Sequence, residues 1–316
     1  MAEAGREAAA QAAQRPLLSN HLTVAERVAA RSYLQQSWLR FKRNRLAIAA
    51  GVLVVIIFCF GFGAPLISKY VTHVGYADQT LLDRFKHPGQ AGYLLGTDNL
   101  GRDVLTRLAY GTRVSTMVAL LAVVSALTIG GTLGSLAGYY GRWVDSVIMR
   151  FVDIMLSIPA LFLLIFIGAL FTISSTTLAL VIAAVSWMGL SRLIRGEIMS
   201  LKRRDYVEAA RVVGASDTRI IARHIVPNVL PIVIVWATLA VPVFIIVEAS
   251  LSFLGLGVQP PVPSLGNMLN GAIAFMDQSW TLIFIPGFMI YVMVLAINLF
   301  GNGLRDALDP RLGEHQ

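Results

Sequence analysis

Charged side chains are scarce in this sequence of 316 residues. Asp, Glu, Lys and Arg together make up 14% of it, whereas a soluble domain carries about 25%. Hydrophobic residues make up 56%. This balance excludes an ordinary soluble domain and indicates an integral membrane protein. In such a protein the net charge of +8 reports orientation and contact with lipid headgroups rather than nucleic-acid binding.

Cysteine and the common catalytic motifs are also missing. The single cysteine, Cys59, lies in an apolar run, so no intramolecular disulfide is possible. No Gly-Lys-Ser or Gly-Lys-Thr occurs, so the chain has no phosphate loop. The five histidines are scattered, and there is no His-Glu-x-x-His or Gly-x-Ser-x-Gly motif. We therefore expect no catalytic residue, no metal site and no cofactor bound by this chain itself.

Two carboxylates lie near the apolar segments, Asp153 and Glu248. Ionisable residues at membrane depth are a usual mark of function. We place these two near opposite membrane faces, because the run that ends at Glu248 is about 30 Å long as a helix. They are therefore not a catalytic pair, and we interpret them as interfacial or helix-packing groups.

Six nearly uncharged runs follow a polar segment at the start of the chain, and a membrane-spanning helix needs about 20 apolar residues. The fourth run is long enough only if the side chain of Arg192 reaches to the membrane interface and places its charged group there. The segment after Val247 is broken by prolines and glycines, so we expect a loop or re-entrant turn at the outer face and no seventh span. The expected spans are Leu46–Ile67, Val114–Tyr139, Ile154–Thr172, Thr176–Leu193, Asn228–Val247 and Gln278–Leu304.

Basic residues cluster in the first 45 residues and in the loop after the fourth run, and none lies in the third or fifth loop. Positive charge favours the cytoplasmic side, so we expect both termini and the fourth loop to be cytoplasmic. The first span starts too late for a cleaved signal peptide and is expected to be retained. The predicted organisation is a cytoplasmic tail (1–45), a first span (46–67), an extracytoplasmic loop (68–112), a five-helix core (113–304) containing the cytoplasmic loop 195–227, and a cytoplasmic tail (305–316).

The charged stretch between the fourth and fifth runs has the signals of two short helices joined by a turn. Asp205 is a candidate N-cap, and Glu208 three residues later completes a pattern like a capping box. Gly214 suits the end of that helix. Ser216 can cap a second helix, and Pro227 is expected to end it. A free tail needs none of these features, so we interpret the stretch as a docking element at the membrane surface.

The same stretch carries a known family pattern. Glu208-Ala209-Ala210, three residues, Gly214, nine residues and then His224-Ile225-Val226-Pro227 resembles the EAA loop of ATP-binding cassette (ABC) importer permeases. Further blocks resemble the dipeptide, oligopeptide and nickel branch of that family, in its "C"-type partner, over about residues 38–313. These blocks are Arg43–Ala47, Gly96–Arg113, Glu248–Pro261 and Gly301–Arg311.

The resemblance implies an all-α integral membrane protein with the type I ABC importer permease fold, six transmembrane helices and both termini in the cytoplasm. It implies a permease subunit in a bacterial inner membrane that forms the translocation path with a homologous second permease. Two ATPase subunits, which bind ATP and Mg, and an extracytoplasmic binding protein would complete the importer, with membrane lipid around it. Di- or oligopeptides are the expected substrates, and nickel or another solute stays open.

The resemblance also implies residue roles. We expect the ATPase to dock on Glu208, Ala209, Ala210 and Gly214. Three nearby arginines either pair with ATPase carboxylates or contact lipid headgroups: Arg203, Arg204 and Arg211. Near the outer ends of the spans we expect two motifs. One comprises Gly96, Thr97, Asp98, Gly101, Arg102 and Asp103, and the other Glu248, Ser252, Gly255, Gly257, Pro260 and Pro261.

The first outer motif has two interpretations. Thr97 and Asp98 beside a glycine form turns, and the charged residues through Arg107 can form local ion pairs, so a structural turn is one. The other is contact with the binding protein or the gate. On the second span, Gly130, Gly131, Gly134 and Gly138 have near-helical spacing. We expect them to pack helices closely rather than to bind substrate.

Two other functions remain as alternatives. A membrane-embedded enzyme is disfavoured because no catalytic motif is present. A membrane-anchored DNA-binding regulator would use the basic helix-turn-helix outline of the charged stretch. That stretch is tied to spans at both ends, so a recognition helix could hardly reach a DNA groove.

Overall fold

The computed structural model describes residues 33–171 and 173–308, and the regular secondary structure of these ranges is helical apart from an isolated bridge between Thr97 and Asp103. Most of the predicted N-terminal tail (1–32), the end of the C-terminal tail (309–316) and Thr172 lie outside the described residues.

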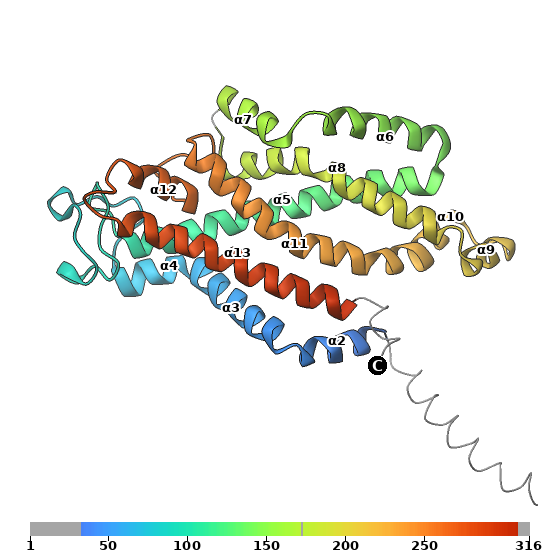
Figure 1. Cartoon of the computed structure of the whole chain (residues 1–316), viewed down its shortest axis with the longest axis horizontal. Coiled ribbons are helices and arrows are strands. Elements are labelled where there is room, and N and C mark those ends of the chain that lie inside the picture. The colour runs from blue at the N-terminus through green and yellow to red at the C-terminus, as the bar shows by residue number, and fades with distance from the viewer. Residues whose placement is uncertain (1–32, 172, 309–316) are drawn as a thin grey trace, which may run out of the picture.

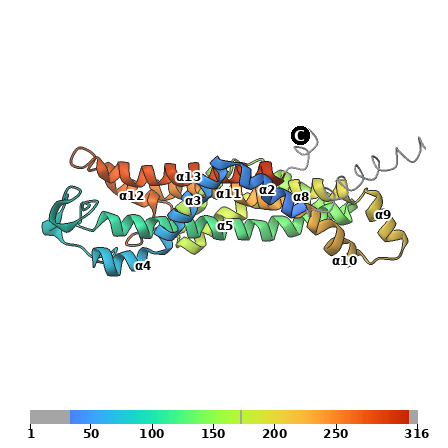
Figure 2. The same ribbon diagram turned by 90° about the horizontal axis from the view of Figure 1, so that it is seen from below.

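The long helices run side by side along the long axis of the molecule (Figures 1 and 2). We call the end that carries residues 68–103 and α12 the loop end, and the opposite end the α9 end. The helices are α2 (Tyr33–Arg43), α3 (Arg45–Phe62), α4 (Ala64–Ile67), α5 (Val104–Tyr140), α6 (Arg142–Leu156), α7 (Ala160–Leu170), α8 (Ser175–Leu201), α9 (Asp205–Val212), α10 (Asp217–Ile220), α11 (Val226–Phe253), α12 (Leu265–Ile273) and α13 (Thr281–Leu308). Single turns lie at Ser68–Thr72, Leu81–Asp83, Gln90–Gly92 and Ile221–Ile225.

Five of the predicted spans are confirmed as long apolar helices. In the described residues, α3, α5, α8, α13 and the continuous segment Asp217–Phe253 are each long and apolar enough to cross a membrane. Their lengths run from 18 to 37 residues, or about 27 to 55 Å at 1.5 Å per residue. The bundle therefore extends beyond a hydrocarbon layer about 30 Å thick.

The third predicted span is wrong as a single helix. The chain forms two helices there, α6 and α7, bent by 77° at a break of a few residues. Pro159 precedes α7 directly, and a proline disfavours helical backbone in the residue before it. Residues 142–153, which the sequence placed in a loop, belong to α6. The count is therefore five spans, or six if the bent pair crosses as one.

The prediction that Pro227 ends the second short helix is wrong. α10 passes through the single π-turn Ile221–Ile225 into α11, and Pro227 lies in the first turn of α11. Proline is tolerated there because the first backbone N–H groups of a helix have no partner within it. The second short helix, α10, is therefore continuous with the fifth predicted span, whereas a turn separates α9 from it.

The predicted close helix packing is confirmed for three of the four glycines, which bring α5 and α8 into close contact. A Cβ atom added at Gly130 would lie 2.6 Å from the backbone oxygen of Trp187, and one at Gly134 would lie 2.5 Å from that of Ser191. Gly131 is different, because its nearest neighbour would be a side-chain atom of Ile194 at 3.9 Å. The helix packing therefore depends on Gly130, Gly134 and Gly138, and Gly131 lies beside a cavity.

The N-terminal helices pack on the end of the chain. Asn44 caps α3 by accepting a hydrogen bond from the N–H of Ala47 at 3.0 Å. Ala47 in turn lies against Gly303, where any Cβ would overlap it. The rings of Phe41 and Phe300 meet edge to face, with centroids 5.7 Å apart. The block Gly301–Arg311 that resembles the family is thus, in its described part, a packing surface for α3.

Candidate functional site

At the α9 end, a few apolar side chains anchor α9 to the bundle. Val207 is fully buried in a cluster with Leu201 of α8 and Ile220 of α10, and Ala210 packs against the same cluster. Of the predicted docking residues, Ala210 therefore turns toward the bundle. Glu208, Ala209 and Gly214 are exposed. α9 is thus fixed by one face and leaves the other free.

The ends of α9 follow the prediction only in part. Asp205 is not the N-cap: Arg204 occupies that position, and no side chain caps the helix. Asp205 and Glu208 instead lie in the first turn, where negative charge is favoured by the helix dipole. Gly214 has the predicted left-handed conformation, with φ +87°. Ser216 caps α10 as predicted, accepting from the N–H of Arg219.

The free surface of α9 contains apolar residues that the sequence analysis missed. Val212 is 87% exposed and Val213 is 88% exposed. A pair of valines is unremarkable in so apolar a sequence, and only its place inside a charged loop could have signalled it. Arg203 and Arg204 are exposed beside α9 and form no ion pair within the described chain. The C-terminal end of α9 is thus an exposed apolar tip, and these two arginines lie at its N-terminal end.

Polar contacts join this element to α5. The hydroxyl of Tyr139 in the last turn of α5 donates a hydrogen bond to Asp217 of α10. The ammonium group of Lys202 donates to the backbone oxygen of Tyr139 and lies 5.2 Å from the centroid of its ring. These contacts tie α10 and the C-terminal end of α8 to the last turn of α5.

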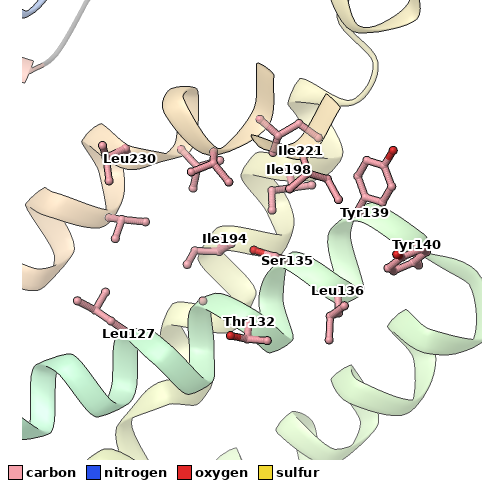
Figure 3. Close-up of a pocket in the computed structure, with 15 residues that line it drawn as sticks. Leu127, Thr132, Ser135, Leu136, Tyr139, Tyr140, Ile194, Ile198, Ile221 and Leu230 are labelled. Carbon is pink, nitrogen blue, oxygen red and sulfur yellow. The ribbon is translucent and has the colours of Figure 1, made fainter. Parts of the chain in front are cut away.

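An apolar cavity of about 390 Å³ lies next to these contacts. Figure 3 shows Leu127 of α5, Ile194 of α8 and Leu230 of α11 around the same space, with Tyr139 and Ile198 toward its other end. The space between these three helices is not filled by side chains of the described residues. The α9 end therefore combines hydrogen bonds between helices with an unfilled apolar space.

At the loop end, the first outer motif builds a tight backbone turn. Gly96 and Gly101 have φ of +80° and +72°, and a Cβ on either would overlap the backbone of Lys86 or Thr80. Thr97 is buried; its hydroxyl donates to the backbone oxygen of Asp83 and accepts from the N–H of Lys86 at 2.9 Å. These contacts support the structural interpretation of the motif.

The charged residues of that motif form the predicted ion pairs and one cap. Asp98 lies 2.7 Å from Nε of Arg102 and 3.6 Å from Nε of Arg107. Arg107, only 5% exposed, also donates from Nη1 to the backbone oxygen of Tyr76 at 3.0 Å. Asp103 caps α5, accepting from the N–H of Thr106 at 2.6 Å. The motif therefore positions the start of α5 and the loop at Tyr76.

The second outer motif is organised by Glu248, which is fully buried. Its carboxylate accepts hydrogen bonds from Ser115 of α5 at 2.6 Å and from Ser252 at 2.7 Å. Ser115 also accepts from the N–H of Leu265 at 3.3 Å, so α5, α11 and α12 meet at this group. The interpretation of Glu248 as a helix-packing group fits this geometry.

The remaining residues of that motif shape the turn between α11 and α12. Gly255 has φ +78°, and a Cβ on Gly257 would overlap Ser252. The bond between Pro260 and Pro261 is cis. The short helix α12 starts after this turn, where the sequence predicted a loop or re-entrant turn and no further span.

The two carboxylates near the apolar segments, Asp153 and Glu248, lie in different contacts. Asp153 pairs with Arg192 of α8, whereas Glu248 is bound on α5 and α11, so the two carboxylates form no pair. In the ranges that the structure covers, no group of three or more His, Cys, Asp or Glu side chains could hold a metal ion.

Two family models match this chain. Residues 130–314 match "Binding-protein-dependent transport system inner membrane component", and residues 32–88 match "N-terminal TM domain of oligopeptide transport permease C". The dipeptide transport system permease protein DppC of Alkalihalophilus pseudofirmus is 40% identical over 279 residues, which is 88% of this chain and 90% of the relative. The oligopeptide transport system permease protein OppC of Escherichia coli K12 is 42% identical over 286 residues, covering 90% and 93%.

Other similar proteins are named for other substrates. The glutathione transport system permease protein GsiD of Pectobacterium atrosepticum is 39% identical, over 88% of this chain and 91% of its own. Among solved structures, the inward-facing MetNI methionine ABC transporter matches 64% of this chain and 96% of its own, with a TM-score of 0.52 at 16% identity. That likeness confirms the type I importer fold. No comparison favours an enzyme or a DNA-binding protein. The chain belongs to the family of inner-membrane permease components of binding-protein-dependent ABC transport systems, and it is a multi-pass protein of the inner membrane.

Proposed function

We propose that this chain is the C-type permease half of an importer of short peptides. A homologous permease would form the translocation path with it, and an extracytoplasmic binding protein would deliver the peptide. The support is the family match together with relatives at about 40% identity whose names specify dipeptide and oligopeptide transport. The glutathione relative also carries a short peptide, so the shared chemistry is that of a small peptide chain.

The proposed orientation puts the α9 end in the cytoplasm and the loop end outside. Arg203 and Arg204 lie at the α9 end, and the basic cluster Lys42–Arg45 precedes the first span. Between α11 and α13 the loop end carries no basic residue. This distribution follows the tendency of positive charge to stay on the cytoplasmic side.

The proposed coupling element is α9, which would dock in a groove of an ATPase subunit. The observation that carries this proposal is the division of the helix into a buried anchor and a free face. Val207 fixes α9 to α8 and α10, while Glu208, Ala209, Val212 and Val213 are exposed. Exposed apolar side chains at the tip of a charged loop favour a protein partner over water.

ATP and Mg would be bound by the ATPase subunits, since this chain has no phosphate loop. When ATP closes the ATPase pair, α9 would move with its groove as a rigid body. The contacts of Tyr139 with Asp217 and Lys202 would pass that motion to α5 and α8. Coupling requires that the ATPase bind α9 differently in its two states, because equal binding in both shifts no equilibrium.

The test is co-purification and uptake. Wild type, Glu208→Ala and the double variant Glu208→Ala with Gly214→Val are expressed with the partner permease and ATPases. We expect the double variant to lose ATPase association and ATP-driven peptide uptake. The single variant separates the loss of a docking group from strain at Gly214, where a valine disfavours the left-handed backbone. Thr218→Ala, at an exposed site on α10, is the matched control.

The coupling assignment fails if the double variant keeps both ATPase association and uptake. The peptide assignment fails separately if the intact wild-type importer hydrolyses ATP in response to its binding protein but takes up no peptide. A variant that no longer reaches the membrane fraction with the partner permease reports on folding, and Glu208→Ala then decides the question.

A further inference from the structure

A second cavity, of about 530 Å³, lies at the loop end of the bundle, and we call it the loop-end cavity. Its volume is within the range of small-molecule sites, about 300 to 1,000 Å³. α5, the start of α8 and the turn before α12 contribute most of its wall, which is mainly apolar. Its polar groups are few and come from Tyr76, Tyr110, Arg113, Ser175 and Thr176.

Arg113 is the only charged residue that lines this cavity, among the described residues. Its Nε atom is buried and has no hydrogen-bond partner, and no carboxylate of the described chain pairs with its guanidinium. A buried donor of this kind costs free energy unless a partner arrives. The nearby arginines Arg102 and Arg107 are both held by Asp98, which makes Arg113 the exception in this region.

The surroundings of Arg113 favour an anion. The N-terminus of α8 lies at the cavity wall through Ser175 and Thr176, and a helix N-terminus carries partial positive charge. In the part of the chain that the structure describes, no Asp or Glu lines the cavity. A guanidinium group with free donors matches the geometry of a carboxylate especially well.

The rest of the cavity suits the body of a small peptide. The rings of Tyr76 and Tyr110 pack together with centroids 4.8 Å apart, and the remaining lining includes Met117, Leu121 and Val262. Apolar and aromatic walls with one charged anchor are the usual make-up of a site for a small organic ligand. Arg107 holds the loop at Tyr76 through the backbone oxygen of that residue, so one wall is fixed by the first outer motif.

We propose that the loop-end cavity binds the C-terminal carboxylate of the transported peptide, with Arg113 as its anchor, before the peptide enters the path between the two permeases. The proposal rests on the proposed function, since it requires a peptide substrate. It makes Arg113 a specificity-determining residue that distinguishes a free peptide from one whose C-terminus is blocked.

The experiment uses the complete importer in proteoliposomes. Saturating binding protein is loaded with a labelled tripeptide, either as the free acid or as the C-terminal amide, so that the uptake rate does not depend on delivery affinity. We expect wild type to take up the acid at least about tenfold faster, which corresponds to one charge-assisted hydrogen bond. Arg113→Gln should lower uptake of the acid to the rate of the amide and leave the amide unchanged.

Two control variants test whether the result depends on the charge and on the position of Arg113. Arg113→Lys keeps the positive charge but loses the planar set of donors, so it should retain only part of the preference for the acid. Arg150→Gln removes an exposed arginine of α6 and should change neither rate. A peptide with a photoreactive phenylalanine gives a direct measurement: it should crosslink to the segment around Tyr76 and Tyr110 in wild type and not in Arg113→Gln.

Several outcomes would overturn the proposal. If wild type takes up the acid and the amide equally and Arg113→Gln changes neither rate, the cavity is not a carboxylate site. The proposal that the chain belongs to a peptide importer would still stand. If Arg113→Gln lowers the ATP hydrolysis that empty binding protein stimulates, the partner of Arg113 is a carboxylate of the binding protein and not that of the peptide. A phospholipid that co-purifies with wild type and is lost in the variant would assign the cavity to a lipid phosphate. If no peptide is taken up at all, the proposed function fails first.

Discussion

Tyr139 and Asp217 are 78 positions apart in the sequence, and the hydroxyl of the tyrosine donates a hydrogen bond to the carboxylate. The contact joins the last turn of α5 to α10, directly beside α9. The backbone oxygen of Tyr139 also accepts a hydrogen bond from the ammonium group of Lys202. These three residues connect the element that we propose to meet the ATPase with the helices that cross the membrane.

Tyr139→Phe removes the hydroxyl and keeps the ring. We expect a loss of about 1 kcal/mol in stability, the usual value of one hydrogen bond, so the subunit should still assemble. Because α10 would then move partly independently of α5, peptide uptake per ATP hydrolysed should fall severalfold. Both rates are measured in proteoliposomes. Tyr140→Phe, at an exposed neighbouring ring, should leave the ratio unchanged, and an unchanged ratio in Tyr139→Phe would contradict the role of this contact.

Val212 and Val213 are the most exposed apolar residues of the proposed docking surface. Val212→Asp should leave folding intact, since surface substitutions usually change stability by less than about 0.5 kcal/mol. A charge buried against an apolar groove is costly, so the amount of ATPase that co-purifies should fall at least about tenfold. Thr218→Asp adds the same charge on exposed α10 and should retain the ATPase. If both variants retain it equally, the valines lie outside the interface.

Local patterns in the sequence account for much of this fold. The apolar runs indicated five of the long helices, and the glycine spacing on α5 indicated close helix packing without naming the partner, because both signals depend on neighbouring positions. Pro159 could have shown the break between α6 and α7, but the apolar residues on either side read as one continuous run. No local signal pairs Ser115 with Glu248, 133 positions apart, or leaves Arg113 without a partner. Such contacts depend on how the helices assemble.

Gly134 and Gly131 lie three residues apart on α5 and differ sharply in their surroundings. Gly134→Ala would place a methyl group 2.5 Å from the backbone oxygen of Ser191, so α5 and α8 must separate. We expect a destabilisation of about 1 to 3 kcal/mol, as for other overpacked sites. Gly131→Ala places its methyl group 3.9 Å from the nearest atom and should be neutral or slightly stabilising. Thermal unfolding of the purified importer in detergent compares them, and equal stabilities would refute the close packing.

Asp98 is the counter-ion of two arginines at the loop end, and Arg107 is the more deeply buried of them. Asp98→Asn keeps the shape of the side chain and removes its charge, which leaves Arg107 buried without a carboxylate. Removing one partner of a buried ion pair costs about 3 to 5 kcal/mol, and we expect the lower end because Asp98 is partly exposed. The loss of stability should appear as thermal unfolding at a lower temperature and as faster proteolysis of residues 68–103.

Asp78→Asn is the matched control for this change. Asp78 is exposed in the same loop and accepts one hydrogen bond, from the N–H of Gly75 at 2.6 Å, so its variant should behave as wild type. Because Arg107 also holds Tyr76 at the wall of the loop-end cavity, Asp98→Asn should weaken the preference for a free peptide carboxylate as well. If proteolysis is faster but that preference is unchanged, the motif stabilises the loop without positioning the cavity.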